Sequence, residues 1–195
     1  MLKVGLSGNI GSGKSVVTRI FDILGIPIYH ADDNAKYMLE FPDVVEKIKE
    51  RFGSWIIDRQ GKVSRKKLAQ IVFSDNKKLD VLNSIIHPLV IADFEKWIHK
   101  QKLCPYVIME SAILYETGYS ALFDKIIIVS APEKIRIDRV MKRDGVTKAD
   151  VLKRMKNQLA EENQLSKADY IIVNDGKTFV VPRVLELHRL LCAVK

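Results

Sequence analysis

A glycine-rich segment near the start of the chain, Gly8 to Ser15, limits the possible folds more than any other part of the sequence. It reads Gly-Asn-Ile-Gly-Ser-Gly-Lys-Ser and fits the pattern G-x-x-x-x-G-K-[ST] of a phosphate-binding loop. An apolar run at 2–6 predicts a buried strand before the loop, and helical spacing of apolar residues from Val16 to Leu24 predicts a helix after it. This order of strand, loop and helix indicates a nucleoside triphosphate site rather than an incidental glycine-rich turn.

Each part of the segment has an expected chemical role. The backbone N–H groups of the loop and of the first helical turn are expected to point at phosphate oxygens. Lys14 would reach the β- and γ-phosphates, and Ser15 would place its hydroxyl on Mg²⁺. The residues expected to bind ATP here are Gly11, Ser12, Gly13, Lys14, Ser15 and Val16.

Length and composition are those of one soluble globular chain with a sizeable core, because 47% of the 195 residues are hydrophobic. We expect no signal peptide, because the first apolar run is short, and no membrane span, because no apolar stretch is long enough for one. Cys104 and Cys192 have no metal-like spacing and indicate free thiols. We therefore expect a cytoplasmic protein, a monomer or weak homo-oligomer, with no membrane partner.

The formal net charge of +8 favours anionic partners, either nucleic acid or phosphorylated metabolites. The sequence has no zinc-ligand spacing, aromatic RNA-binding motif or long basic tail. We therefore expect no nucleic-acid partner, although charge alone does not decide between the two.

Five short apolar runs, separated by helical patterns, predict an α/β fold with a five-stranded parallel sheet. The runs are 2–6, 26–29, 105–109, 125–129 and 169–173. The helical stretch between the second and third runs is longer than a crossover requires, so it predicts an α-helical insertion that closes over a second substrate. Within it, His87-Pro88 is expected to start a long helix.

Acidic residues follow two of the predicted strands, at the sheet edge where ligands collect in parallel α/β folds. Asp32 and Asp33 follow the second run; we assign Asp32 to proton transfer and Asp33 to capping the next helix. Glu110 ends the third run and is expected to hold Mg²⁺ through water. Glu116, in the loop that follows, is either a substrate contact or a solvated carboxylate, and its spacing leaves both open.

A region from 132 to 165 has the pattern of a helical lid. Arg136, Arg139 and Arg143 share one stripe of its first helix, separate from the apolar stripe. Thr147 is expected to cap a second helix that runs to about residue 165 and carries Arg154 and Gln158 on one face. The pattern favours a phosphate clamp, the alternative being solvated arginines.

These features together predict phosphoryl transfer by a small-molecule kinase. Such an enzyme needs charge stabilisation, alignment and exclusion of water more than covalent chemistry. A GTP-dependent switch would carry an N-K-x-D-type guanine motif, which Asn174-Asp175-Gly176 does not match. A nucleic-acid-binding ATPase would carry added binding elements, so both remain weaker alternatives.

An ordered set of further matches runs through nearly the whole chain. They are Gly5 to Gly8 leading into the loop, Ala31-Asp32, Leu82-Asn83, His87-Pro88-Leu89, Ile113-Leu114-Tyr115-Glu116, Pro132-Glu133, Arg139, Arg143-Asp144, Arg154, Gln158, Ala168-Asp169 and Asn174. In this order they resemble the dephospho-CoA kinase family. Another P-loop kinase of a nucleotide or small metabolite is the alternative.

The resemblance implies a three-layer P-loop kinase-like fold and transfer of the ATP γ-phosphate to the ribose 3′-hydroxyl of dephospho-CoA, with Mg²⁺. It implies a nucleotide core at 1–31, 104–131 and 166–195, a CoA-binding region at 32–103 and a lid at 132–165. Asp32 would be the base, while Arg139 and Lys14 would stabilise the transferred group. Arg143 and Asn174 would lie near adenine. The implied substrate-binding residues are Asp32, His87, Leu114, Tyr115 and Glu116, although His87 has an equally good structural role at a helix bend.

Several positions depart from the family pattern. His30 replaces a frequent Asp, Asn9 a frequent Gly and Val16 a common Thr, and Ser111-Ala112 replaces an apolar residue and Pro. None of these changes removes Lys14, Ser15, Asp32 or Arg139, so they bear on substrate affinity more than on reaction type.

Overall fold

The structure is a computed structural model that describes residues 1–72, 74–101, 104–156 and 158–194. The chain divides into two compact units, one formed by 1–30 and 101–195 and the other by 31–100. Residues 73, 102 and 103 of the expected CoA-binding region, and residue 157 of the expected lid, lie outside the described residues. None of the helices in the described part of the chain is both long and apolar enough to span a bilayer.

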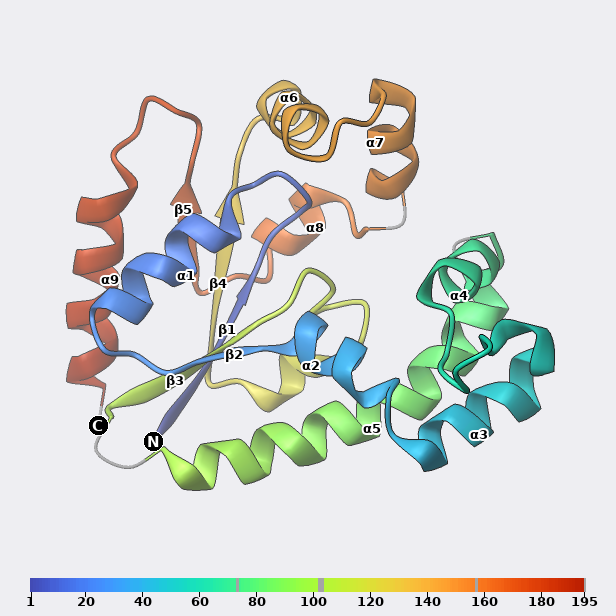
Figure 1. Ribbon diagram of the computed structural model, residues 1–195. Coiled ribbons are helices and arrows are strands. Elements are labelled where there is room, and N and C mark those ends of the chain that lie inside the picture. The colour runs from blue at the N-terminus through green and yellow to red at the C-terminus, as the bar shows by residue number, and fades with distance from the viewer. Residues whose placement is uncertain (73, 102–103, 157, 195) are drawn as a thin grey trace. The chain divides into compact units, whose positions relative to one another are not determined.

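A parallel sheet forms the centre of the first unit (Figure 1). Its strands lie in the order β2-β3-β1-β4-β5, and every neighbouring pair is parallel. They are β1 Leu2–Ser7, β2 Ile28–His30, β3 Tyr106–Glu110, β4 Lys125–Ser130 and β5 Tyr170–Val173. Each strand begins within two residues of the first residue of a predicted apolar run. This confirms the predicted α/β class and the five-stranded parallel sheet.

Two helices cover one face of this sheet (Figure 1): α1 Lys14–Ile23 and α9 Val180–Ala193. Val17 and Phe21 of α1 and Leu187 of α9 are buried in one cluster with strand residues such as Leu6 and Ile127. This burial fixes α1, and with it the phosphate loop, against the ends of the central strands. On the opposite face, Leu114 and Phe123 lie against Gly5.

The described residues of the expected lid, 132–156 and 158–165, form three helices instead of two: α6 Glu133–Asp144, α7 Lys148–Met155 and α8 Glu161–Leu165. Thr147 caps α7 through a capping box with Asp150, as predicted. The prediction that this helix continues to about residue 165 is wrong. The backbone N–H of Leu159 bonds to Glu116 instead of a helical carbonyl, at 2.7 Å. Contacts with other parts of the unit therefore override the local helical pattern.

The second unit is helical, as its sequence pattern predicts. It contains α2 Ala31–Met38, α3 Pro42–Phe52, the 3₁₀ turn η1 Ser54–Ile56, α4 Arg65–Val72 and α5 Asn76–Lys100. Helices α2, α3 and α4 each contact α5.

Two expectations for this unit are wrong. Pro88 lies inside α5 and does not start a helix. Proline removes one backbone donor there, but the flanking turns bury Ile86, Val90 and Phe94, which stabilises the continuous helix. Asp33 is not a helix cap, because α2 begins at Ala31.

Candidate active site

The phosphate loop joins β1 to α1, and Gly11 and Gly13 are among the positions where it requires glycine. Gly11 has φ +80° and Gly13 has φ +93°, in the left-handed region that side chains disfavour. A Cβ at residue 11 would lie 2.5 Å from the Arg136 carbonyl oxygen, and one at residue 13 would overlap the Asn174 side-chain nitrogen. The close approach of α6 and Asn174 therefore holds the loop in its curled form.

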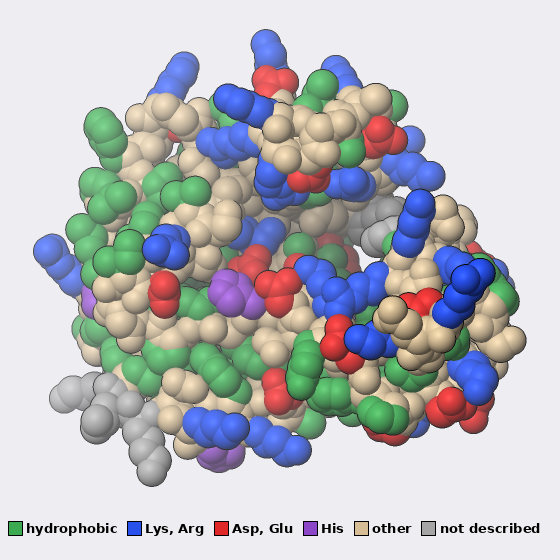
Figure 2. Space-filling model, in the orientation of Figure 1, with side chains coloured by type: hydrophobic (Ala, Val, Ile, Leu, Met, Phe, Trp, Pro, Cys, Tyr) green, Lys and Arg blue, Asp and Glu red, His purple; other side chains and the backbone are tan. Residues whose placement is uncertain are grey.

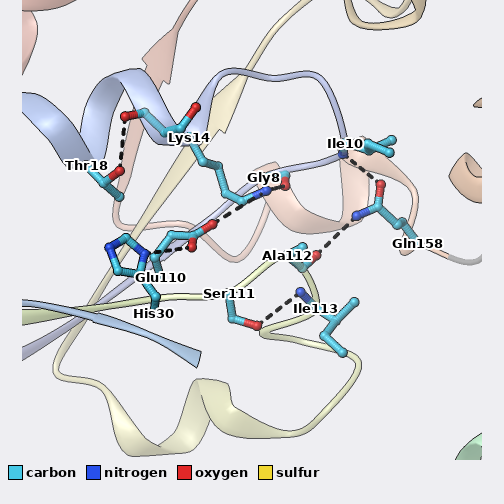
Figure 3. A network of polar contacts seen from close by, with 11 residues as sticks. Gly8, Ile10, Lys14, Thr18, His30, Glu110, Ser111, Ala112, Ile113 and Gln158 are labelled. Carbon is cyan, nitrogen blue, oxygen red and sulfur yellow. Dashed lines mark hydrogen bonds and ion pairs between the residues drawn. The ribbon is translucent and has the colours of Figure 1, made fainter. Parts of the chain in front are cut away.

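Lys14, Glu110 and His30 form a polar network at the carboxyl ends of three adjacent strands (Figure 3). Glu110 aligns with Leu6 of β1 and with His30 of β2 in the sheet register, which explains why these side chains meet. The Lys14 ammonium donates to the Gly8 carbonyl at 2.8 Å and lies 3.9 Å from Glu110 Oε1. His30 Nδ1 lies 3.3 Å from Glu110 Oε2. The structure thus joins the loop lysine to the acidic residue expected at the strand end.

The donor set at this edge fits Mg²⁺. Ser15 is exposed in the first turn of α1, and Glu110 supplies a carboxylate that is 16% exposed. Among the described residues no three His, Cys, Asp or Glu side chains form a metal-binding group. One or two protein oxygens completed by phosphate and water are how Mg²⁺ is usually held in nucleotide sites.

Arg139 and Asn174 both contact carbonyl groups of the phosphate loop. The Arg139 guanidinium donates to the Gly11 and Ser12 carbonyl oxygens at 3.4 Å each, and to Asn174 Oδ1 at 3.3 Å. Asn174 Nδ2 donates to the Ser12 carbonyl at 2.9 Å. The arginine expected to act on the transferred phosphoryl group therefore lies beside the loop.

The three arginines of the predicted stripe have three different environments. Lys and Arg side chains are frequent over α6 and α7 (Figure 2). Arg143 is exposed and forms a bidentate pair with Asp144, which Arg154 also contacts. These bonds, first that of Arg143 and then that of Arg154, lower the pKa of Asp144 to about 2. Arg136 is buried and pairs with Glu161, so its predicted role in a phosphate clamp is wrong.

The segment after β3 contains the expected substrate contacts Leu114, Tyr115 and Glu116. Leu114 is fully buried, so its side chain belongs to the core. Burial, and secondarily the Asp169 carboxylate, raises the pKa of Tyr115, and Lys167 Nζ lies 5.8 Å from the centre of its ring. Glu116 Oε1 accepts the bond from the Leu159 N–H, a structural role that the spacing did not suggest.

The second unit carries the other two expected residues. Asp32 lies in the first turn of α2, half-buried, next to an exposed Asp33 that pairs with Lys36 at 2.7 Å. His87 lies within α5, and burial lowers the pKa of its imidazole. Their roles stay predictions.

Three residues missing from the predicted site contact it directly. Gln158 bridges Ile10 and Ala112 (Figure 3), while Gln164 Nε2 donates to Asn9 Oδ1 at 2.7 Å. Glu161 holds Arg136. Of these three residues, only Gln158 was indicated by the sequence, through its spacing from Arg154 and its match to the family pattern.

Comparisons with known proteins agree with this geometry. The family model described as dephospho-CoA kinase matches residues 2–179. A dephospho-CoA kinase of Leptospira interrogans is 42% identical over 175 residues, which are 89% of this chain and 84% of that relative. A dephospho-CoA kinase of Porphyromonas gingivalis is 39% identical over 191 residues, covering 96% of this chain and 93% of the relative.

A solved structure of a Thermus thermophilus protein has a TM-score of 0.88 at 29% identity, covering 100% of this chain and 98% of that one. The family model spans most of the residues that build the phosphate loop, the Glu110 network and the Arg139 contacts. The chain belongs to the dephospho-CoA kinase family.

Proposed function

We propose that this protein transfers the γ-phosphoryl group of ATP to the ribose 3′-hydroxyl of dephospho-CoA, giving CoA and ADP. The observation that carries the proposal is the ion pair between Lys14 and Glu110 beside a curled phosphate loop, in a chain of this family. The names of the Leptospira and Porphyromonas relatives support the acceptor.

The loop is the proposed site for the ATP phosphates. Its N–H groups and the positive end of the α1 dipole favour anions. The Lys14 ammonium would leave the Gly8 carbonyl for the β- and γ-phosphate oxygens, which are stronger acceptors because they are charged. Arg139 would stabilise charge on the transferred group from its position beside Gly11 and Ser12. Arg143 and Asn174 are the proposed adenine neighbours.

Ser15 and, through water, Glu110 are the proposed holders of Mg²⁺. When bound there, Mg²⁺ would neutralise part of the negative charge of the ATP phosphates. The Lys14 contact and the neighbouring His30 fix the Glu110 carboxylate on two sides.

Asp32 is the proposed base. Its carboxylate would accept the proton of the acceptor 3′-hydroxyl as that oxygen bonds to the γ-phosphorus and the bond to the ADP oxygen breaks. His87, Leu114, Tyr115 and Glu116 are the proposed substrate contacts, with Leu114 acting through its backbone because its side chain is buried. Cys104 and Cys192 are free thiols, which supports a reducing cytosol as the working compartment.

The test is ATP consumption with Mg²⁺, with and without dephospho-CoA, followed by mass and positional analysis of the product. Stimulated turnover and a product one phosphate heavier at the 3′ position are the expected result. Turnover with a nucleoside monophosphate but not with dephospho-CoA would favour another P-loop kinase activity. Stimulation by RNA or DNA alone would instead indicate a nucleic-acid-dependent ATPase.

A further inference from the structure

We propose that Gln158 is a positioning residue, whose side-chain amide fixes the spacing between the phosphate loop and the segment that follows Glu110. Gln158 Oε1 accepts the backbone N–H of Ile10 at 2.8 Å, and its Nε2 donates to the Ala112 carbonyl at 3.2 Å (Figure 3). Both contacts lie within the first unit. The inference rests on the proposed function, because it assigns a further residue to that active site.

The two backbone partners specify an amide side chain at this position. A backbone N–H can only donate and a carbonyl can only accept, so the orientation of the Gln158 amide is fixed by its partners. A carboxylate lacks the donor for Ala112, and an ammonium lacks the acceptor for Ile10. The bridge therefore depends on residue type as well as on side-chain length.

The bridge lies beyond the end of the backbone pairing between β1 and β3. The Ser111 N–H donates to the Leu6 carbonyl at 3.1 Å, just past the last residue of β3. Ile10 and Ala112 come after that point on the two chain segments, and Gln158 connects them by its side chain. The Gln158 side chain therefore adds one more cross-link between the loop that leads into Lys14 and the segment that follows Glu110.

Neighbouring contacts hold Gln158 in this place. The next residue, Leu159, donates its N–H to Glu116 at 2.7 Å, on the same segment as Ala112. The buried Gln164 donates to the Leu159 carbonyl at 3.2 Å and to Asn9 at 2.7 Å, next to Ile10. The stretch 158–164 thus makes two hydrogen bonds to the phosphate loop, at Asn9 and Ile10. It makes two more to the segment that follows β3, at Ala112 and Glu116.

Two substitutions separate the two bonds. Gln158→Met has similar length and removes both bonds, whereas Gln158→Glu keeps an acceptor for Ile10 and loses the donor to Ala112. Gln60→Met and Gln60→Glu, at an exposed position, make the same changes as controls. We expect roughly 10-fold lower kcat in both Gln158 variants, in line with loss of one or two hydrogen bonds, and no change in the controls.

Two further experiments test the bridge without an acceptor substrate. NMR amide exchange in the full chain tests the hydrogen bond of Ile10, and ADP affinity with and without Mg²⁺ tests the geometry of the site. Ile10 exchange is expected to rise in Gln158→Met and to stay slow in Gln158→Glu. The Ser12 amide, which donates to the Asn9 carbonyl at 3.0 Å, should stay protected in both. The gain in ADP affinity that Mg²⁺ confers should fall several-fold in both, because the spacing between Ser15 and Glu110 is no longer fixed.

Unchanged Ile10 exchange in Gln158→Met would overturn the proposal, because the bond would not exist in solution. Faster Ile10 exchange with wild-type Mg²⁺ dependence and wild-type kcat would also overturn it, leaving a bond without a positioning role. If dephospho-CoA is not phosphorylated by the wild type, the proposed function fails, while amide exchange and ADP affinity still decide the role of Gln158.

Discussion

Arg136 and Glu161 form an ion pair with 3.1 Å between Nη2 and Oε2, in which the arginine side chain is 5% exposed and the glutamate 24%. The same glutamate accepts the Ser130 hydroxyl at 2.6 Å, and Arg136 Nε donates to the Ala131 carbonyl at 2.9 Å. The pair therefore ties α6, α8 and the end of β4 together. Because the backbone of Arg136 also packs against Gly11, this anchor supports the phosphate loop.

Removing one partner of this pair should destabilise the protein strongly. Glu161→Ala leaves a buried guanidinium without its carboxylate, and we expect a loss of about 3 kcal/mol, the lower part of the range for buried pairs because Glu161 keeps some exposure. For a chain of this size that corresponds to a fall in Tm of about 6–12 °C. Thermal unfolding measures it. Glu162→Ala, the exposed neighbour, is the control and should change stability by less than about 0.5 kcal/mol.

Arg139→Ala should lower kcat far more than it changes nucleotide affinity. The guanidinium acts most strongly on charge that develops in the transition state, and such arginines are typically worth about 10³–10⁵-fold in rate. Steady-state kinetics together with ADP titration separates the two effects. Lys142→Ala, an exposed cation on the same helix, controls for the change in charge. A fall in ADP affinity as large as the fall in kcat would assign Arg139 to ground-state binding instead.

Asp32→Asn should lower kcat by about 10²–10⁴-fold, the usual contribution of a general base, and leave ATP binding close to that of the wild type. Asp33→Asn is a matched control, because this neighbouring carboxylate is exposed and pairs with Lys36. Single-turnover kinetics with dephospho-CoA measures the chemical step directly. Near-wild-type turnover of Asp32→Asn would contradict the assignment, and Glu110 would become the next candidate.

The sheet and the phosphate loop were predictable because each depends on short-range patterns. Apolar runs of four or five residues become the parallel strands of the sheet, and the phosphate-binding pattern is complete within residues 8–15. Glu110 was predictable as a site residue for the same reason, because it ends a strand. The register aligns it with Leu6 of β1, and its carboxylate lies 3.9 Å from the Lys14 ammonium. Local sequence and tertiary structure agree at these positions.

The unpredicted parts depend on partners that are far away in the sequence. The helix break before Gln158 arises because its neighbour Leu159 bonds to Glu116, 43 residues earlier. Arg136 and Arg139 lie on one helix stripe, but only Arg136 meets Glu161, and no local pattern distinguishes them. Pro88 was expected to start a helix, but burial of the residues on both sides keeps it inside one continuous helix instead.

Asp144 should make a small, pH-dependent contribution to stability. Its hydrogen bond with Arg143, and then that with Arg154, lower its pKa from 3.8 to about 2 in the folded chain. Because the pKa of this carboxyl is lower in the folded chain than in the unfolded chain, Asp144 stabilises the fold at pH values above its unfolded pKa. This contribution is lost as the pH falls from about 4 to about 2. Asp144→Asn resembles the protonated side chain, so its effect should be largest near neutral pH.

We expect Asp144→Asn to lower Tm by about 1–3 °C at pH 7, because the pair with Arg143 is largely exposed. The difference from the wild type should narrow steadily between about pH 4 and pH 2, and also in 1 M salt, where exposed charges are screened. Thermal unfolding of both proteins over this pH range checks it, with Asp138→Asn as an exposed control on the same helix. A difference in Tm that stays constant down to pH 2 would show that packing, rather than the charge of Asp144, holds α6 and α7 together.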